Sequence, residues 1–368
     1  MRDAWYPVLL SKELPGGQPL PVKLFGDPLV LFRDESGQPA CFLDACPHRF
    51  VPLSLGKVRR GRLACAYHGW QYNGAGRCVH LPLLPEGQSI PRTAVAHAYP
   101  CMEREGAVWI WPGDPRRAAA SPLPLPTELP EGFELTNQLH KRIPSRYDYL
   151  IEHVLDLPHF FQVHAATLLR LYPASRKSLP EVVDVQESAE EMTVRFYYQI
   201  FSQRLPVTMK IFRPCHMRVD MALPGGRSFT ALFFNTPTDE THTRGNMFVY
   251  RGFLTAPVLR QLSNWLLELT FYKAINEDMH LLSGQMENLA MKAKSTTGYF
   301  FDALLNRYHR WQRHADEQDL WFQGFEHARQ RCAASPALES AAVPPEVEAA
   351  PAGPAPWGRP PAFGGSDR

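Results

Sequence analysis

One short segment, residues 46–68, constrains the fold of this chain more than any other feature. It holds two arms: Cys46 and His48 are separated by one residue, and Cys65 and His68 are separated by two. Each arm offers one thiolate and one imidazole, so a hairpin over the intervening residues would bring four metal ligands together. The segment therefore predicts a metal site.

Two kinds of site use these four donors. A Cys2His2 zinc site usually pairs cysteine with cysteine on one arm and histidine with histidine on the other. A [2Fe-2S] cluster with two cysteines on one iron and two histidines on the other accepts mixed arms, because each arm then supplies one ligand to each iron. The mixed arms favour the iron-sulfur cluster over zinc.

The surrounding sequence is organised as two folded regions. Short apolar or alternating runs broken by Gly, Pro and Asp continue to Trp111, which predicts a small all-β domain over residues 1–112. Residues 113–132 are rich in proline and are expected to be a linker. A second domain is expected over residues 133–330, and the Ala/Pro/Glu-rich residues 331–368 are expected to be a disordered tail.

Composition excludes several classes of function. The formal net charge of +2 over 368 residues gives no field that would indicate a nucleic acid or an anionic membrane as partner. Seven cysteines are an odd number, and those outside the metal site are expected to be reduced thiols of a cytoplasmic protein. Since we find no secretory signal or membrane span, we expect a soluble protein, with peripheral membrane contact left open.

The second domain opens with another histidine pair. Apolar residues from Leu150 to Leu155 have helical spacing, and Pro158 ends or kinks that helix just before His159. His159 and His164 are five residues apart, and an irregular helix could point both imidazoles at one metal. Two histidines at this spacing are, taken alone, more often ordinary core or surface groups. His153 is expected to be a residue of the polar face of the helix.

Further along, alternating strands are expected between residues 182 and 251, with a turn at Pro224-Gly225-Gly226. A long helix follows from Pro257 to about Lys294. It carries Glu277 and Asp278 beside its apolar stripe. A site with two histidines and one carboxylate lacks only its acid, so either residue could complete it; a solvated surface acid is the alternative.

The motifs together resemble those of the Rieske non-haem iron oxygenases. C-P-H-R followed by C-x-Y-H-G-W is similar to the cluster loops of that family, and D-x-x-H-x-x-x-x-H matches Asp156, His159 and His164. The resemblance implies that His159, His164 and Asp278 bind a mononuclear iron, with Glu277 as the second choice for the acid. It also implies that Asp156 links the two metal centres. The family often has Asn four residues before this Asp, where the chain has Glu152.

On this resemblance we expect an α+β protein: an all-β Rieske [2Fe-2S] domain followed by a helix-grip, START-like catalytic domain with an antiparallel sheet flanked by helices. Its cofactors would be one cluster held by Cys46, His48, Cys65 and His68, one mononuclear Fe(II), and O2 as co-substrate. Electrons would come from a separate ferredoxin or flavin-containing reductase, because no flavin or NAD fingerprint is present. A homotrimer is implied, in which the cluster of one subunit serves the iron of its neighbour.

Within the family, W-Y-P near the start, C-P-H-R-x-x-P-L-S and the Y-H-x-W segment look most like the chlorophyllide a oxygenase and pheophorbide a oxygenase group. The expected activity is monooxygenation of an apolar, tetrapyrrole-like ring compound at a methyl or ring carbon. One alternative is a vanillate-type aromatic O-demethylase. Another is a Rieske electron carrier fused to a domain without catalytic function.

Overall fold

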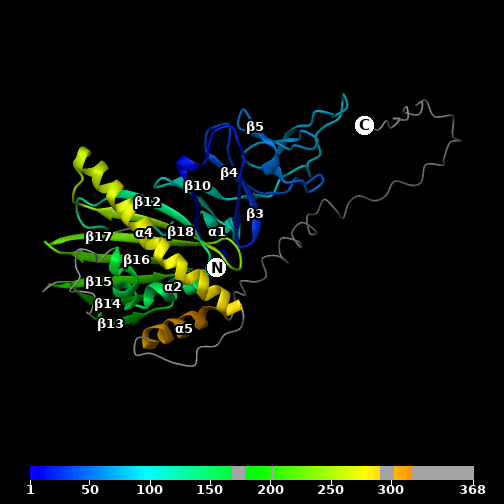
Figure 1. The fold of residues 1–368 in the computed structure, drawn as a ribbon. Helices are drawn as coiled ribbons and strands as arrows, with labels where there is room; N and C mark the ends of the chain where they lie inside the picture. Colours follow the sequence, from blue (N-terminus) through cyan, green and yellow to red (C-terminus); the bar gives the residue numbers. More distant parts are fainter. Residues whose placement is uncertain (127, 168–178, 201–202, 291–301, 317–368) are drawn as a thin grey trace, which may run out of the picture.

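The computed structural model describes the chain except residues 127, 168–178, 201–202, 291–301 and 317–368. The expected tail over residues 331–368, the end of the expected second domain and the last residues of the expected long helix lie outside the described residues. The described part is α+β, with an all-β N-terminal region beside a broad antiparallel sheet that carries helices, as the sequence predicted (Figure 1).

The N-terminal region consists of three small antiparallel sheets, ordered β1-β11-β10, β2-β3-β4-β9 and β5-β6-β7-β8. The first ligand arm follows β4 of the second sheet, and the second arm joins β6 to β7 of the third. The strand bounds are β1 Tyr6–Leu10, β2 Leu20–Leu24, β3 Asp27–Arg33, β4 Pro39–Leu43, β5 Lys57–Arg59, β6 Arg62–Ala64, β7 Gln71–Tyr72, β8 Cys78–His80, β9 Ala98–Tyr99, β10 Cys101–Arg104 and β11 Ala107–Ile110. The short helix α1, Pro115–Ala118, follows in the proline-rich segment.

The second region is built on one seven-stranded antiparallel sheet, ordered β12-β18-β17-β16-β15-β14-β13. Its strands are β12 Glu134–Ile143, β13 Glu181–Glu187, β14 Glu191–Ile200, β15 Gln203–Phe212, β16 His216–Leu223, β17 Arg227–Pro237 and β18 Thr243–Arg251. The turn expected at Pro224-Gly225-Gly226 joins β16 to β17. Strand β12 was not expected, because Asn137, His140 and Lys141 obscure its apolar alternation.

The two faces of this sheet have different partners, as the period-two alternation of a strand requires. Leu232 and Phe234 of β17 pack against Trp109 and its neighbours in the N-terminal region. Ala231 lies on the opposite face, in a cluster that Phe271 of the long helix α4, Pro257–Ala290, packs against. The sheet is therefore a middle layer, with the N-terminal region on one side and helices on the other (Figure 1).

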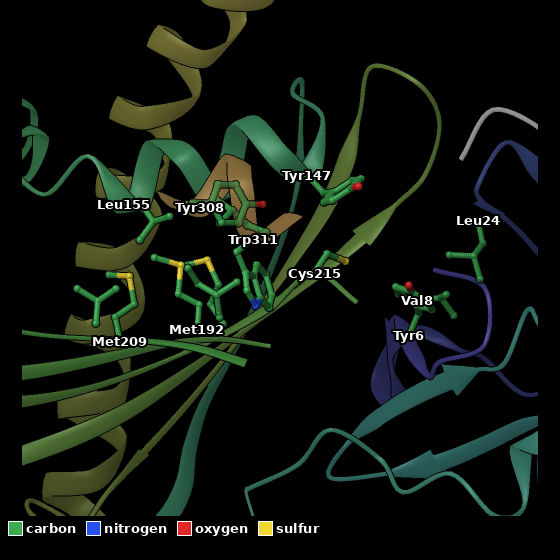
Figure 2. Close-up of a cluster of buried hydrophobic side chains, with 14 of the residues drawn as sticks. Tyr6, Val8, Leu24, Tyr147, Leu155, Met192, Met209, Cys215, Tyr308 and Trp311 are labelled. Carbon is green, nitrogen blue, oxygen red and sulfur yellow. The ribbon is translucent and has the colours of Figure 1, made fainter. Parts of the chain in front are cut away.

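Two further helices, α2 Tyr147–Leu155 and α5 Asp302–Asp316, lie over β14 and β15. Figure 2 shows Tyr308 and Trp311 of α5 above the sheet, with Tyr147 of α2 nearby and the side chain of Cys215 between this group and the N-terminal residues. All four side chains belong to one buried cluster that extends to Tyr6 of β1. One apolar core thus joins the two regions. Among the described helices, none has the length and apolar character needed to cross a membrane.

Candidate metal centres and cavity

The two ligand arms are built as the same turn. The amide of Cys46 donates to the carbonyl of Val51 at 2.9 Å, and the amide of Phe50 donates to the carbonyl of Cys46 at 2.7 Å. The second arm repeats both bonds, from Cys65 to Trp70 at 2.9 Å and from Gly69 to Cys65 at 3.0 Å. The fifth residue of each turn has a positive φ, 57° in the first and 70° in the second. The arms are therefore related by local repetition of one loop.

The four candidate ligand side chains converge, with the thiols on the inner side and the imidazoles on the outer side. The thiols of Cys46 and Cys65 are 3% and 4% exposed, whereas both imidazoles are half-buried toward the surface. The rings of His48 and His68 lie 4.8 Å apart between centroids. Such a set would suit a [2Fe-2S] cluster, with the two thiolates held inside and the two imidazoles toward the surface.

Two neighbours hold these side chains in place. The Trp70 ring stacks on His48 at 4.7 Å with 3° between the planes. The Tyr72 hydroxyl lies 3.3 Å from the Cys46 sulfur. Burial raises the pKa of the Cys46 thiol, and contact with Tyr72 opposes that shift. A hydroxyl at this distance favours the thiolate, which is the form that binds iron.

A second group of donors forms where α2, the short helix α3 His159–Val163 and α4 meet. Pro158 follows α2 as expected, and the chain re-enters a helix at once, which turns His159 and His164 toward α4. The Nε2 atom of His164 lies 3.2 Å from Oδ1 of Asp278. The rings of His159 and His164 are 5.5 Å apart. The three residues expected to bind iron are therefore brought together.

The outer nitrogens of both histidines have fixed partners. Nδ1 of His159 donates to the carbonyl oxygen of Asp156 at 2.7 Å, which leaves Nε2 without a proton in the neutral ring. Nδ1 of His164 lies 3.0 Å from Oε2 of Glu277. Thr167 donates its hydroxyl to the other oxygen of Glu277. Glu277 thus orients a histidine, and Asp278 is the acid that faces the other donors.

The charges around this group suit metal binding. Burial, together with the nearby ring of His153, lowers the pKa of His159 to about 4, so this imidazole is neutral near pH 7. Burial alone would raise the pKa of Asp278, but hydrogen bonds with His153 and His164 outweigh it and lower that pKa to about 2. Burial alone would lower the pKa of His164, but the interactions with Asp278 and Glu277 outweigh it and raise that pKa.

The expectation for His153 is wrong. Its side chain is 13% exposed, and its Nε2 lies 3.0 Å from Oδ1 of Asp278. Neither the residue type nor the local spacing predicts the contact between His153 and Asp278, because Asp278 lies on α4, more than a hundred residues further along the chain. Glu152, whose role the sequence leaves open, points elsewhere: its carboxylate lies 2.9 Å from Nε2 of His309 on α5.

The donor set passes a simple test as a metal site. One ligand atom from each of His153, His159 and Asp278 lies within 4.8 Å of the others. His164 is not in this group, although its Nε2 lies 3.2 Å from the same carboxylate. Imidazole nitrogens with one carboxylate oxygen are the donors that a mononuclear non-haem iron takes. The residues present therefore fit the expected iron.

A cavity of about 340 Å³ lies against this donor set. His159, His164 and Asp278 contribute to its wall. The rest of the wall is mainly apolar and comes from the inner face of the sheet and from α3 and α4, including Phe160, Phe196, Tyr198, Met209, Met221, Phe233, Met247, Leu267 and Phe271. Pockets with a few convergent polar groups in an apolar wall are typical of small-molecule sites.

Family models match both the N-terminal region and the second region of the chain. Residues 4–96 match the model of the Rieske [2Fe-2S] domain. Residues 143–317 match the model of the vanillate O-demethylase oxygenase C-terminal domain. The first range contains both ligand arms, and the second contains the histidine pair and Asp278.

Individual relatives extend these matches. Chlorophyllide a oxygenase of Chlamydomonas reinhardtii is 33% identical over 329 residues, which cover 85% of this chain and 48% of that protein, so the chain spans about half of its length. A 4beta-methylsterol monooxygenase of Methylococcus capsulatus is 31% identical over 277 residues, covering 71% of this chain and 70% of that protein. The crystal structure of dicamba monooxygenase bound to dicamba shares the fold with a TM-score of 0.70 at 23% identity, covering 86% of this chain and 98% of that chain. Because both halves match family models and a relative above 30% identity is covered over 70% of its length, this chain belongs to the Rieske non-haem iron oxygenases.

Proposed function

We propose that this chain is a terminal oxygenase that uses O2 and electrons from a separate ferredoxin or flavin-containing reductase to oxidise an apolar ring substrate. In this proposal Cys46, His48, Cys65 and His68 hold the [2Fe-2S] cluster. His159, His164 and Asp278 hold one mononuclear Fe(II). The observation that carries the proposal is the position of this second donor set, in the wall of an apolar cavity and outside the cluster domain.

A ferrous ion at this second site would supply the chemistry of dioxygen activation. The chain's own residues prepare that site. The Asp156 carbonyl and the Glu277 carboxylate each hold the outer nitrogen of a histidine, so that both Nε2 atoms are presented to the metal. The apolar wall excludes water from the substrate carbon, and its aromatic rings, such as Phe160 and Tyr198, orient a flat substrate.

The cavity favours a neutral or weakly polar ring over a small aromatic acid. Among the described lining residues, Arg251 is the one cationic side chain, and it is fully buried. Its guanidinium donates to Ser263 and Asn264 at 2.6 Å each, which ties β18 to α4. Each of the two donor pairs with which a guanidinium binds a carboxylate includes Nη2, which is already engaged, so Arg251 has no free donor pair for a substrate carboxylate, although its buried Nε has no partner among the described residues. This argues against the vanillate-type demethylase and for monooxygenation of an apolar, tetrapyrrole-like compound.

The volume limits how such a compound binds. A cavity of about 340 Å³ is near the lower end of the roughly 300–1,000 Å³ that is usual for ligand sites. We infer that a tetrapyrrole would place the ring edge with the oxidised methyl or ring carbon in the cavity, and the rest of the macrocycle outside it. Chlorophyllide a oxygenase and pheophorbide a oxygenase, which are named for tetrapyrroles, are among the relatives.

We also propose a homotrimer in which Asp156 links the cluster of one subunit to the iron of the next. Asp156 supports this role because its backbone carbonyl already orients His159, while its half-buried side chain is a separate group. A cytoplasmic location is our proposal for the compartment. The described cysteines are all free thiols, which suits a reducing environment. Several relatives are named as chloroplastic.

A single-turnover experiment tests the proposed function without the native reductase. The iron-loaded protein is reduced, freed of excess reductant and exposed to 18O2 with a chlorophyllide-like tetrapyrrole, a methylsterol or vanillate. We expect three irons per chain and one labelled oxygen in the tetrapyrrole product. Formation of 3,4-dihydroxybenzoate and formaldehyde from vanillate alone would support the demethylase instead, because the incorporated oxygen leaves with the formaldehyde. Two irons per chain and no labelled product from any compound would support the electron carrier.

A further inference from the structure

His153 occupies a position that the iron site as proposed does not explain. Helix α2 directs its imidazole to the same carboxylate oxygen, Oδ1 of Asp278, that His164 approaches from η3, His164–Ala166. The His153 ring also lies 4.4 Å from the ring of His159 at a tilt of 39°. Three imidazoles from three separate helical segments thus converge on one carboxylate.

The distances are those of neighbouring ligands around one metal. With metal-to-ligand bonds of about 2.1 Å and angles near 90°, adjacent donor atoms are roughly 3.0 Å apart. Nε2 of His153 is 3.0 Å from Oδ1 of Asp278, and Nε2 of His164 is 3.2 Å from it. By its distance from the Asp278 oxygen, His153 is as well placed as His164 to share a metal ion with Asp278.

A purely structural role for His153 explains less. Asp278 already interacts with His164, so a second histidine is not needed to compensate its charge. A simple hydrogen bond would also not require the His153 ring to lie against His159. The group of ligand atoms within 4.8 Å of one another consists of His153, His159 and Asp278, so His153 belongs to the most compact donor set of the site.

We propose that His153 binds the mononuclear iron through Nε2, which makes the centre a three-histidine, one-carboxylate site. This inference rests on the proposed function, because it assumes the iron that His159, His164 and Asp278 hold. In a six-coordinate centre, four protein ligands leave two positions for dioxygen and water, where three would leave three. His153 would therefore restrict access at the metal as well as strengthen its binding.

Counting coordinated imidazoles tests the proposal directly. The full chain is produced with 15N-labelled histidine and loaded with iron, the cluster is kept oxidised and therefore diamagnetic, and the ferrous site is treated with nitric oxide as a paramagnetic probe. Pulsed electron paramagnetic resonance then resolves the coordinated nitrogens. We expect three histidine nitrogens in the unaltered protein and two in His153→Gln. The glutamine amide nitrogen can reach the position of Nε2 and donate to Asp278, so a role limited to that hydrogen bond would survive this substitution.

Two further measurements separate coordination from packing. In His153→Ala, added imidazole is expected to restore the third nitrogen, and iron affinity in a chelator competition is expected to fall at least about tenfold in both variants. His280→Gln, at an exposed position of α4, is the matched control and should keep three nitrogens. Two nitrogens in the unaltered protein, or an unchanged count in His153→Gln, would overturn the inference and leave the proposed oxygenase intact. Absence of any nitrosyl signal in iron-replete protein would contradict both the His153 inference and the proposed oxygenase function.

Discussion

The two proposed metal centres are assembled in opposite ways. The four residues proposed to hold the cluster all lie within residues 46–68, on two arms that repeat one turn with the same pair of backbone hydrogen bonds. The residues proposed for the second centre come from α2, α3, η3 and α4, and Asp278 follows His164 by more than a hundred residues. The first site is fixed by local backbone geometry, and the second exists only when distant helices pack over the sheet.

The two centres should therefore respond differently to substitution. A substitution in a turn of the cluster loops should have a local effect, because each arm carries its own hydrogen bonds. A substitution at the second centre should also act indirectly, through side chains that orient the proposed ligands, as Glu277 orients His164.

Asp278→Ala should eliminate iron at the second centre and leave the cluster untouched. The substitution removes the one carboxylate that both His153 and His164 approach, so iron affinity and product formation should each fall at least about 100-fold. Metal analysis should give two irons per chain with an unchanged cluster spectrum. Asn276→Ala, at an exposed position of the same helix, is the control. Loss of the cluster spectrum in Asp278→Ala would show that the two centres fold as one unit.

Cys65→Ser should eliminate the cluster and leave the iron of the second centre in place. A serine oxygen is a poor ligand for this cluster, so its absorption and its electron paramagnetic resonance signal should disappear, while the second site keeps its single iron. Cys78→Ser provides a matched control, since Cys78 lies nearby in β8 but outside the four ligands. If the second site also lost its iron, the contrast between a local and a tertiary site would fail.

Asp156→Ala should break the link between the centres and preserve both. The carbonyl that orients His159 belongs to the backbone and remains in the variant. We expect full occupancy of both metals, normal reduction of the cluster and a decrease of at least about 100-fold in product per reduced cluster, measured in a single turnover. Full coupled activity in this variant would refute the proposed bridge.

Glu277→Gln should weaken the second centre without abolishing it. The glutamine carbonyl can still accept a hydrogen bond from Nδ1 of His164, but the negative charge that makes this imidazole a stronger ligand is lost. Iron affinity, measured by competition with a chelator, should fall about 10- to 100-fold. Glu287→Gln, at an exposed position of α4, should leave that affinity within experimental error.

Gly69→Ala should have the smallest effect and should reveal the limit of the similarity between the loops. Gly69 has φ 70°, and a Cβ there would lie 3.0 Å from Cγ of Pro82. We expect a loss of about 1–2 kcal/mol in the free energy of unfolding of the cluster domain, followed by loss of cluster absorption on heating. Phe50→Ala, at the corresponding position of the first loop, should change it by less than about 0.5 kcal/mol, because a non-glycine residue already adopts φ 57° there. Equal effects would mean that the steric contact at Pro82 is unimportant.

Much of the fold could be predicted from the sequence, and the exceptions have physical causes. Alternation identified most strands of the large sheet, because one face of each contacts the core. It missed β12, whose buried Asn137 donates to the backbone of α4 at 3.0 Å, a contact that no pattern in the strand reveals. The long helix was expected, but the exposure of Leu262, Trp265 and Leu269 on its N-terminal half was not.

For the candidate sites, the sequence alone was enough to predict the four residues that would hold the cluster, since residues a few positions apart in a turn are close in any fold that contains the turn. It also selected His159, His164 and the Glu277-Asp278 pair as candidates, through resemblance to a family. Tertiary structure alone decided that Asp278 faces the histidines while Glu277 orients one of them, and that His153 joins the group. The physical reason is that contacts between helices depend on how each helix is rotated against the sheet, and that rotation is set by packing of the whole core.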